Sequence, residues 1–145
     1  MVAFVDAVKE GLDACGQVVL CTVTDVQGST PGKKGFRMVV FADGQIRGTV
    51  GGGKIEYLAA EKAKEMLRSG CSGNEEYSLT ETEDGCGMVC GGKMSVRFSF
   101  ITKDNPADKE LFDKAAACIA VNQQCYFKEN IALDHFLAEL IFPVC

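Results

Sequence analysis

The segment RMVVFADGQIRGTVGGGKIE, residues 37–56, contains the two transitions that decide the fold. Asp43-Gly44 lies between two apolar runs, and this dipeptide is typical of the type I′ turn of a β-hairpin. Gly51-Gly52-Gly53 then ends the second run, and a helical pattern of apolar residues follows it. The segment therefore predicts a strand, a tight turn, a second strand and a helix in immediate succession.

The flanking sequence supplies the other elements, because apolar residues recur in it at helical or strand spacing. The expected elements are a helix that Gly16 ends, a strand over residues 18–26, hairpin strands over 37–42 and 45–50, a helix that Gly70 ends, strands over 75–80 and 94–100, a helix opened by Asn105-Pro106, and an amphipathic helix around Leu133, Phe136, Leu137 and Leu140. In the strand over 94–100, apolar residues alternate with Ser95, Arg97 and Ser99, which indicates a half-buried strand. These elements predict an α+β fold with helices packed against a mixed or antiparallel sheet and no Rossmann domain.

The composition is that of one soluble globular domain. The chain has 145 residues, 47% hydrophobic and 24% charged, which is enough to bury a core. The formal net charge of −5 argues against nucleic acid as a partner, because phosphate backbones are bound by a basic excess. No apolar run is long enough to cross a bilayer, and residues 1–11 carry no export signal. We therefore expect a cytoplasmic protein with no membrane partner, whose eight cysteines stay reduced.

Three glycine clusters stand at the ends of apolar runs, at residues 28–32, 48–53 and 85–92. Glycine adopts positive φ cheaply and allows a ligand to approach the backbone closely. We therefore expect the clusters to shape a site from backbone amides. The second cluster opens a helix, where free amides and the helix dipole favour an anion such as a phosphate. A tight strand-to-helix turn, with Glu56 stabilising the dipole, explains the same residues equally well.

Cys86 and Cys90 lie inside the third cluster. Amides around Cys90 would stabilise its thiolate, which is a soft metal ligand, and the alternative is a buried thiol in a glycine-rich loop. We favour the ligand, because packing alone does not require four nearby glycines. The C-x₃-C spacing is a weak zinc signal, and His135, the only histidine, is remote and has no nucleophile near it in sequence. Four other cysteines fall in apolar or helical patterns and are expected in the core: Cys15, Cys21, Cys118 and Cys125.

In order and spacing these motifs resemble the XdhC/CoxI family, the accessory proteins of xanthine dehydrogenase and related molybdenum hydroxylases. The likeness rests on Gly28-Ser29-Thr30-Pro31, Gly35-Phe36-Arg37-Met38, Asp43-Gly44, Gly48-Thr49-Val50-Gly51-Gly52-Gly53 with Glu56, and Gly87-Met88-Val89-Cys90-Gly91-Gly92. It runs from about residue 18 to 101, so residues 1–102 are identified as an XdhC/CoxI-like domain and 103–145 as a helical C-terminal extension packed on it. Full-length members add a C-terminal Rossmann-like domain, so we expect this chain to correspond to their N-terminal domain only.

The resemblance implies a protein that binds molybdenum cofactor (molybdopterin) as cargo, helps to deliver it, and associates with an apo molybdenum hydroxylase. Cys90 falls on the cysteine of the family's Cys-Gly-Gly motif, which implies that it contacts the cofactor and its metal. We assign eight further residues to the cofactor site: Ser29, Arg37, Gly51, Gly52, Gly53, Glu56, Gly91 and Gly92. The chain departs from many members at Gly32-Lys33-Lys34, where they have arginine, and at Lys54, where they have cysteine.

The leading hypothesis is therefore a cofactor carrier or insertion chaperone and not a turnover enzyme. One alternative is a thiol-based redox or sulfur-transfer enzyme in which Cys90 reacts and Cys86 is its resolving partner. Another is a ligand-free partner-binding domain whose Rossmann domain is a separate protein. Family members tend to be dimers, and an apolar helix around residues 133–140 would leave an exposed patch on a monomer. We therefore expect a homodimer.

Overall fold

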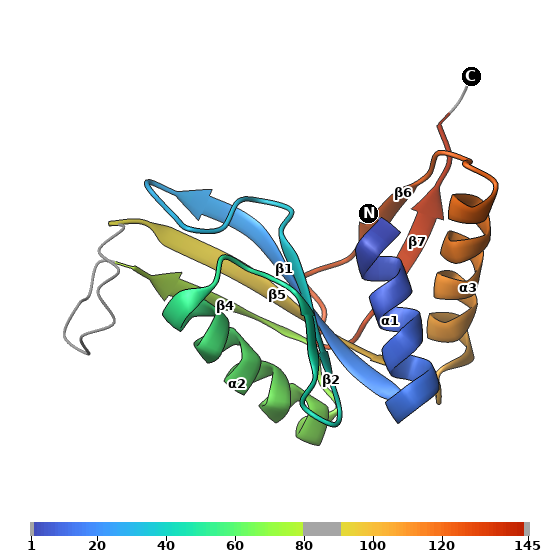
Figure 1. The fold of residues 1–145 in the computed structure, drawn as a ribbon, viewed down its shortest axis with the longest axis horizontal. Coiled ribbons are helices and arrows are strands. Elements are labelled where there is room, and N and C mark those ends of the chain that lie inside the picture. Colours follow the sequence, from blue (N-terminus) through green and yellow to red (C-terminus); the bar gives the residue numbers. More distant parts are fainter. Residues whose placement is uncertain (1, 80–90, 144–145) are drawn as a thin grey trace.

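Within residues 2–79 and 91–143, which this computed structural model describes, five strands form one antiparallel sheet (Figure 1). The elements are α1 (Val2–Cys15), β1 (Gln17–Gln27), β2 (Arg37–Phe41), β3 (Ile46–Gly48), α2 (Gly53–Ser69), β4 (Gly73–Ser78), β5 (Lys93–Thr102), α3 (Pro106–Ala120), β6 (Tyr126–Glu129) and β7 (Ala138–Ile141). The strand order is β3-β2-β1-β5-β4, and β6 pairs with β7 in a separate two-stranded sheet. The α+β prediction is confirmed, and nothing in the described residues suggests a Rossmann fold.

Both faces of the five-stranded sheet are covered. Successive residues of a strand point to opposite faces, so Val18 and Leu20 of β1 pack with α1 and α3, while Val19 and Cys21 pack with α2. The layer of α1 and α3 also receives β6 and β7, which lie beside these helices in Figure 1. Four phenylalanine rings join these elements, with centroids 5.6–6.4 Å apart: Phe4, Phe112, Phe127 and Phe136.

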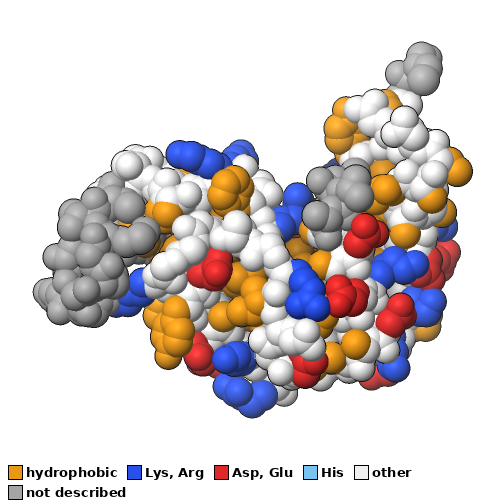
Figure 2. Space-filling view, in the orientation of Figure 1, with side chains coloured by type: hydrophobic (Ala, Val, Ile, Leu, Met, Phe, Trp, Pro, Cys, Tyr) orange, Lys and Arg blue, Asp and Glu red, His pale blue; other side chains and the backbone are white. Residues whose placement is uncertain are grey.

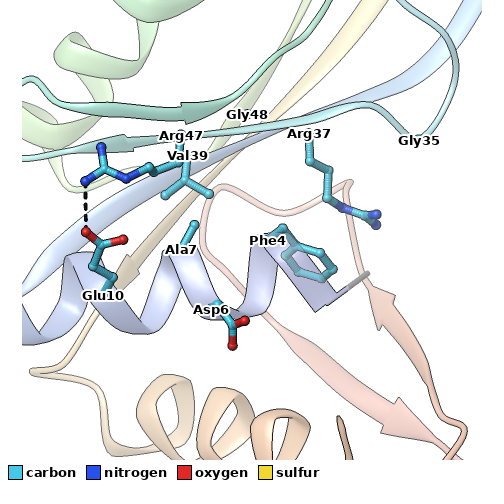
Figure 3. Close-up of a pocket in the computed structure, with 9 residues that line it drawn as sticks. All are labelled: Phe4, Asp6, Ala7, Glu10, Gly35, Arg37, Val39, Arg47 and Gly48. Carbon is cyan, nitrogen blue, oxygen red and sulfur yellow. Dashed lines mark hydrogen bonds and ion pairs between the residues drawn. The ribbon is translucent and has the colours of Figure 1, made fainter.

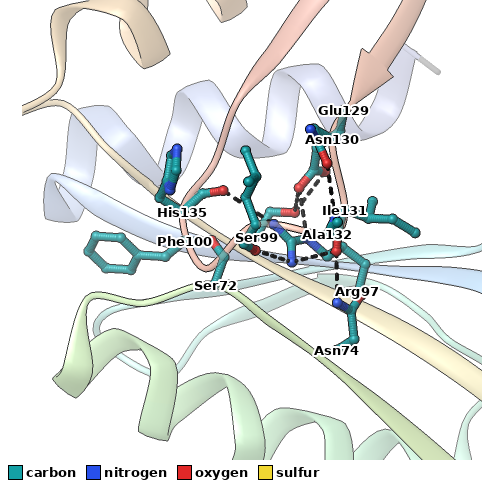
Figure 4. A network of polar contacts seen from close by, with 11 residues as sticks. Ser72, Asn74, Arg97, Ser99, Phe100, Glu129, Asn130, Ile131, Ala132 and His135 are labelled. Atoms are coloured by element: carbon teal, nitrogen blue, oxygen red, sulfur yellow. Dashed lines mark hydrogen bonds and ion pairs between the residues drawn. The ribbon is translucent and has the colours of Figure 1, made fainter.

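The polar side of β5 is buried, which corrects the expectation of a half-buried strand. Arg97 and Ser99 both have 0% of their surface exposed. The end of β6 and the segment that follows it cover them, and supply Glu129 and several backbone carbonyls as hydrogen-bond partners (Figure 4). Alternation along the strand cannot distinguish a solvated polar face from one that a distant segment satisfies.

The β2–β3 hairpin is confirmed, but its expected type I′ turn is wrong. The Gly44 amide donates to the Phe41 carbonyl at 2.9 Å, and the Phe41 amide donates to the Gln45 carbonyl at 2.8 Å. The loop therefore has three residues, and only Gly44 among them has a positive φ, of 91°. A type I′ turn requires positive φ at both central residues, whereas three-residue loops place one glycine in this conformation.

The expected helix around residues 133–140 is also wrong, because this segment forms a loop and then β7. Phe136 is buried, and Ala138 and Leu140 pack against the same core, while Leu137 is 56% exposed. Burial at every second residue is the strand period. Positions four apart, such as Phe136 and Leu140, satisfy both the helical and the strand period, so a short apolar run does not separate the two structures.

Asp108, in the first turn of α3, is a buried carboxyl group. It is 4% exposed and accepts a hydrogen bond from the Thr102 amide at 3.2 Å. Burial raises its pKa from 3.8 to about 6, against the smaller effect of this hydrogen bond. The folded chain therefore binds the proton more tightly than the unfolded chain does, so stability falls as the pH rises from about 4 through 6.

We expect Asp108→Asn to remove this pH dependence and to raise the free energy of unfolding at pH 7.5 by up to about 3 kcal/mol. The amide oxygen of asparagine still accepts from the Thr102 amide. Urea unfolding at pH 5 and pH 7.5 measures the effect, with Asp104→Asn as an exposed carboxylate control. If the free energy of unfolding changed with pH equally in Asp108→Asn and in the parent chain, Asp108 would not be the source of the pH dependence.

Candidate functional site

Three segments that carry the glycine clusters meet at one edge of the fold. Ser29 pairs with Gly91 in an isolated parallel bridge, which joins the loop after β1 to the start of β5. In the same loop, a Cβ placed on Gly32 would lie 2.1 Å from the Val50 carbonyl oxygen. The loop over residues 28–32 therefore lies between the segments 91–92 and 50–51 and contacts both.

The glycines in these segments have two different physical roles. At Gly32 and Gly92, the backbone of another segment occupies the space of a side chain, at 2.1 and 2.3 Å from the Cβ position. At Gly52 and Gly91, nothing lies within 4 Å of that position, but φ is 77° and 70°. Gly32 and Gly92 therefore allow two backbone segments to pack closely. Gly52 and Gly91 allow a left-handed backbone conformation beside open space.

The start of α2 already holds a carboxylate. Glu56 accepts a hydrogen bond from the Gly52 amide at 3.3 Å and another from the Thr49 hydroxyl, and the Gly51 amide donates to that hydroxyl at 3.0 Å. A carboxylate in this position stabilises the positive end of the helix dipole. The turn interpretation of the second cluster therefore explains Glu56. Gly53, the first residue of α2, is exposed and its amide has no acceptor within the helix, so an anion at this helix could use that amide.

Sequence reasoning missed Thr49, which links the end of the β3 segment to the first turn of α2. Its hydroxyl contacts a residue seven positions away across a glycine turn, and no local motif marks that contact. Three lysines on the same segments are exposed and place positive charge beside the glycines: Lys33, Lys34 and Lys93.

The structure groups some of the expected site residues and separates others. Ser29, Gly91 and Gly92 lie together, and the loop of Ser29 connects them to residues 51–53. Cys86 and Cys90 lie outside the described residues. The side chain of Arg37 lies on the other face of the sheet, 4.4 Å above the Phe4 ring of α1.

Four of the five described thiols lie in or beside the core, and Cys71 is exposed. Cys21, Cys118 and Cys125 are buried, and Cys15 is partly buried. Burial raises the pKa of the Cys21 thiol and keeps it neutral. In the part of the chain that the structure describes, no group of three His, Cys, Asp or Glu side chains is placed to hold a metal ion. No described helix is both long and apolar enough to cross a membrane.

Known proteins resemble this chain in sequence and in fold. Residues 12–78 match the model of the XdhC and CoxI family, which confirms the resemblance that the glycine motifs indicated. The uncharacterized protein YqeB of Escherichia coli K12 is 33% identical over 97 residues, which are 66% of this chain and 18% of YqeB. A crystal structure described as a xanthine dehydrogenase from Bacillus halodurans superposes with a TM-score of 0.74 at 22% identity, over 96% of this chain and 42% of that one. The chain thus spans less than half the length of these relatives.

Proposed function

Since residues 12–78 match the model of the XdhC and CoxI family, we propose that this chain is the cofactor-binding part of an accessory protein for a molybdenum hydroxylase. Its cargo is molybdenum cofactor, which combines a phosphate with a metal–sulfur centre. It acts as a carrier or insertion chaperone in the cytoplasm, and its partner is an apo hydroxylase of the xanthine dehydrogenase type. A Rossmann domain, on the same protein or on a separate one, completes it.

The observation that carries this proposal is the meeting of the three glycine segments. Cys90 directly precedes Gly91, and the Gly91–Ser29 bridge places this point of the chain beside the loop over residues 28–32. That loop in turn contacts Gly51, two residues before the amide of Gly53. We infer that the Cys90 thiolate and backbone donors of these segments serve one cargo, because a soft metal and a hard phosphate require such different ligands.

We assign the two ends of the cargo to different residues. The metal–sulfur centre lies against Cys90, with Gly91 and Gly92 allowing close approach. The phosphate lies toward residues 51–53, where Lys33 and Lys34 offset the charge of Glu56. Glu56 also suits a pterin ring, because a carboxylate accepts hydrogen bonds from the amino and ring N–H groups of such a heterocycle.

We expect Cys90→Ser to lose most of the bound cargo while the chain stays folded, because a hydroxyl is a harder and less acidic ligand than a thiol. Cys86→Ser is the matched control and retains the cargo. Each variant is produced in a molybdenum-replete host and gel-filtered, and its molybdenum content, pterin fluorescence and melting temperature are measured.

Full retention by Cys90→Ser, or equal loss in both cysteine variants, would remove Cys90 from the site. A persulfide or mixed disulfide trapped on Cys90 would indicate a thiol enzyme. Co-purification of the parent chain with a hydroxylase and no pterin would indicate a ligand-free partner-binding domain.

We also propose that the protein is a homodimer. The expected apolar helix does not exist, but large apolar side chains on and beside the hairpin of β6 and β7 are exposed. These are Tyr126, Leu137, Ile141 and Phe142, which are 40–56% exposed. A second copy would cover them.

A further inference from the structure

A pocket lies on the α1 face of the sheet, between α1 and the β2–β3 hairpin (Figure 3). Its volume is about 440 Å³, which is within the usual range of small-molecule sites. Phe4, Ala7 and Val39 form its apolar wall. The residues that pack beside the glycine segments, Val50 and Met94, belong to the opposite face. The pocket is therefore separate from the proposed cargo site.

Arg37 is the unpaired cation of this pocket. Its guanidinium lies 4.4 Å above the centroid of the Phe4 ring, and its Nε is inaccessible to solvent and has no hydrogen-bond partner. Burial lowers the pKa of Arg37 and the charge of Glu129 opposes this, but Arg97 and Ser99 already hold that carboxylate. A buried donor without a partner is costly and calls for an acceptor.

The other charges of the pocket are paired or lie at its rim. Arg47 donates to Glu10 at 2.8 Å and stacks on Phe41, and Figure 3 shows this pair at the far end from Arg37. Asp6 also lines the pocket, from the exposed side of α1. Helix α1 has no acidic residue in its first turn, so the positive end of its dipole near Phe4 is uncompensated by its own side chains. The end of the pocket at Arg37 thus carries positive charge, while the carboxylates of Asp6 and Glu10 also line the pocket. Figure 2 shows Lys and Arg side chains interspersed with Asp and Glu on this side of the molecule.

We propose that this pocket binds a small organic anion, whose carboxylate or phosphate pairs with Arg37 and whose flat apolar part lies against Phe4, Ala7 and Val39. The planar fork of an arginine matches both groups in a bidentate fashion. An aromatic ring already covers one face of the guanidinium, so the ligand would pair with the N–H groups at its edge. Asp6 and Glu10 disfavour long polyanions, which restricts the ligand to a single anionic group.

The test uses benzoate and inorganic phosphate as probes, titrated into the ¹⁵N-labelled chain at low ionic strength. We expect saturable NMR shifts of the Arg37 Nε–H and of the amides of Phe4, Gly35 and Gly48. Comparing the two probes distinguishes a site for a carboxylate with an apolar part from a site for free phosphate. Phe4→Leu should weaken the binding of benzoate more than the binding of phosphate. Arg37→Gln should reduce the affinity at least about tenfold, and Arg37→Lys should have an intermediate effect.

The matched control is Arg68→Gln, which removes an equal charge from the exposed end of α2. Equal loss in the Arg37 and Arg68 variants, or shifts that do not saturate and spread over the exposed lysines, would overturn the proposal. If Arg37→Gln does not fold, Arg37→Lys and Phe4→Leu decide the result. Because the cargo test measures molybdenum and pterin, a failure of either proposal leaves the other intact.

Discussion

Replacement of Arg97 by methionine is expected to reduce the free energy of unfolding by about 3–5 kcal/mol. Arg97 is fully buried, and its Nε donates to the Glu129 carboxylate at 2.9 Å. Its two terminal nitrogens donate to the carbonyls of Ile131, Leu133 and His135. Methionine fills a similar space but removes the cation from the Glu129 carboxylate, which keeps the Ser99 hydroxyl, and a donor from each of the three carbonyls. The uncompensated buried charge is the largest part of the loss.

Two controls separate this effect from a general effect of losing an arginine. Arg47 and Glu10 form an ion pair of similar length, 2.8 Å, but their side chains are 38% and 52% exposed. Arg47→Met should therefore cost less than about 1 kcal/mol in ion-pair energy. Adding Glu129→Gln to Arg97→Met should recover part of the loss, because the buried charge is removed. Urea unfolding of the three variants measures these differences, and similar losses for Arg97→Met and Arg47→Met would contradict the role of burial.

The Arg97 network also explains how the C-terminal segment is attached to the domain. The Asn74 side chain donates to the Ile131 carbonyl at 2.8 Å, and the Ser72 amide donates to the Asp134 carbonyl at 2.8 Å. Together with Arg97, these contacts fix the loop between β6 and β7 across β5 and β4 (Figure 4). The loop has no regular structure of its own, so its position depends on side chains of the sheet.

Much of the fold follows from periodicity and from residues that start or end elements. The Gly70 amide donates to the Met66 carbonyl at 2.8 Å with φ of 72°, as a glycine that ends a helix does. The Asn105 side chain accepts from the Ala107 amide at 3.1 Å, as a residue that opens a helix does. These signals are local in sequence, and the structure confirms both helices at the expected ends.

Contacts between distant segments could not be predicted from the sequence in the same way. Arg97 and Glu129 are 32 positions apart, and neither residue type indicates the other as a partner. For the candidate site, sequence identified the glycine clusters, and only the structure shows that the loop of Ser29 joins two of them. The side chain of Arg37 lies apart from the glycine segments for a related reason. Its backbone accepts from the Thr49 amide, but strand geometry directs its side chain to the opposite face of the sheet.

Gly32→Ala is expected to destabilise the chain by about 3 kcal/mol or more, at the upper end of the cost of overpacking. Gly32 does not have a positive φ, so alanine fits its backbone conformation. The added methyl group would lie 2.1 Å from the Val50 carbonyl oxygen and 2.8 Å from the Met94 side chain. Because the oxygen belongs to the backbone, the loop over residues 28–32 must move away from residues 50–51.

Gly91→Ala is the matched control, because its φ is 70° and nothing lies within 4 Å of its Cβ position. It should cost only about 1–2 kcal/mol, from backbone strain. If the glycine segments form the cargo site, Gly32→Ala should also reduce the molybdenum retained by the folded fraction, since it separates the two halves of that site. Thermal melts and gel filtration with molybdenum analysis measure both effects. Equal stability of the two variants would show that the loop does not pack against residues 50–51, and full retention by a destabilised Gly32→Ala would separate cargo binding from this contact.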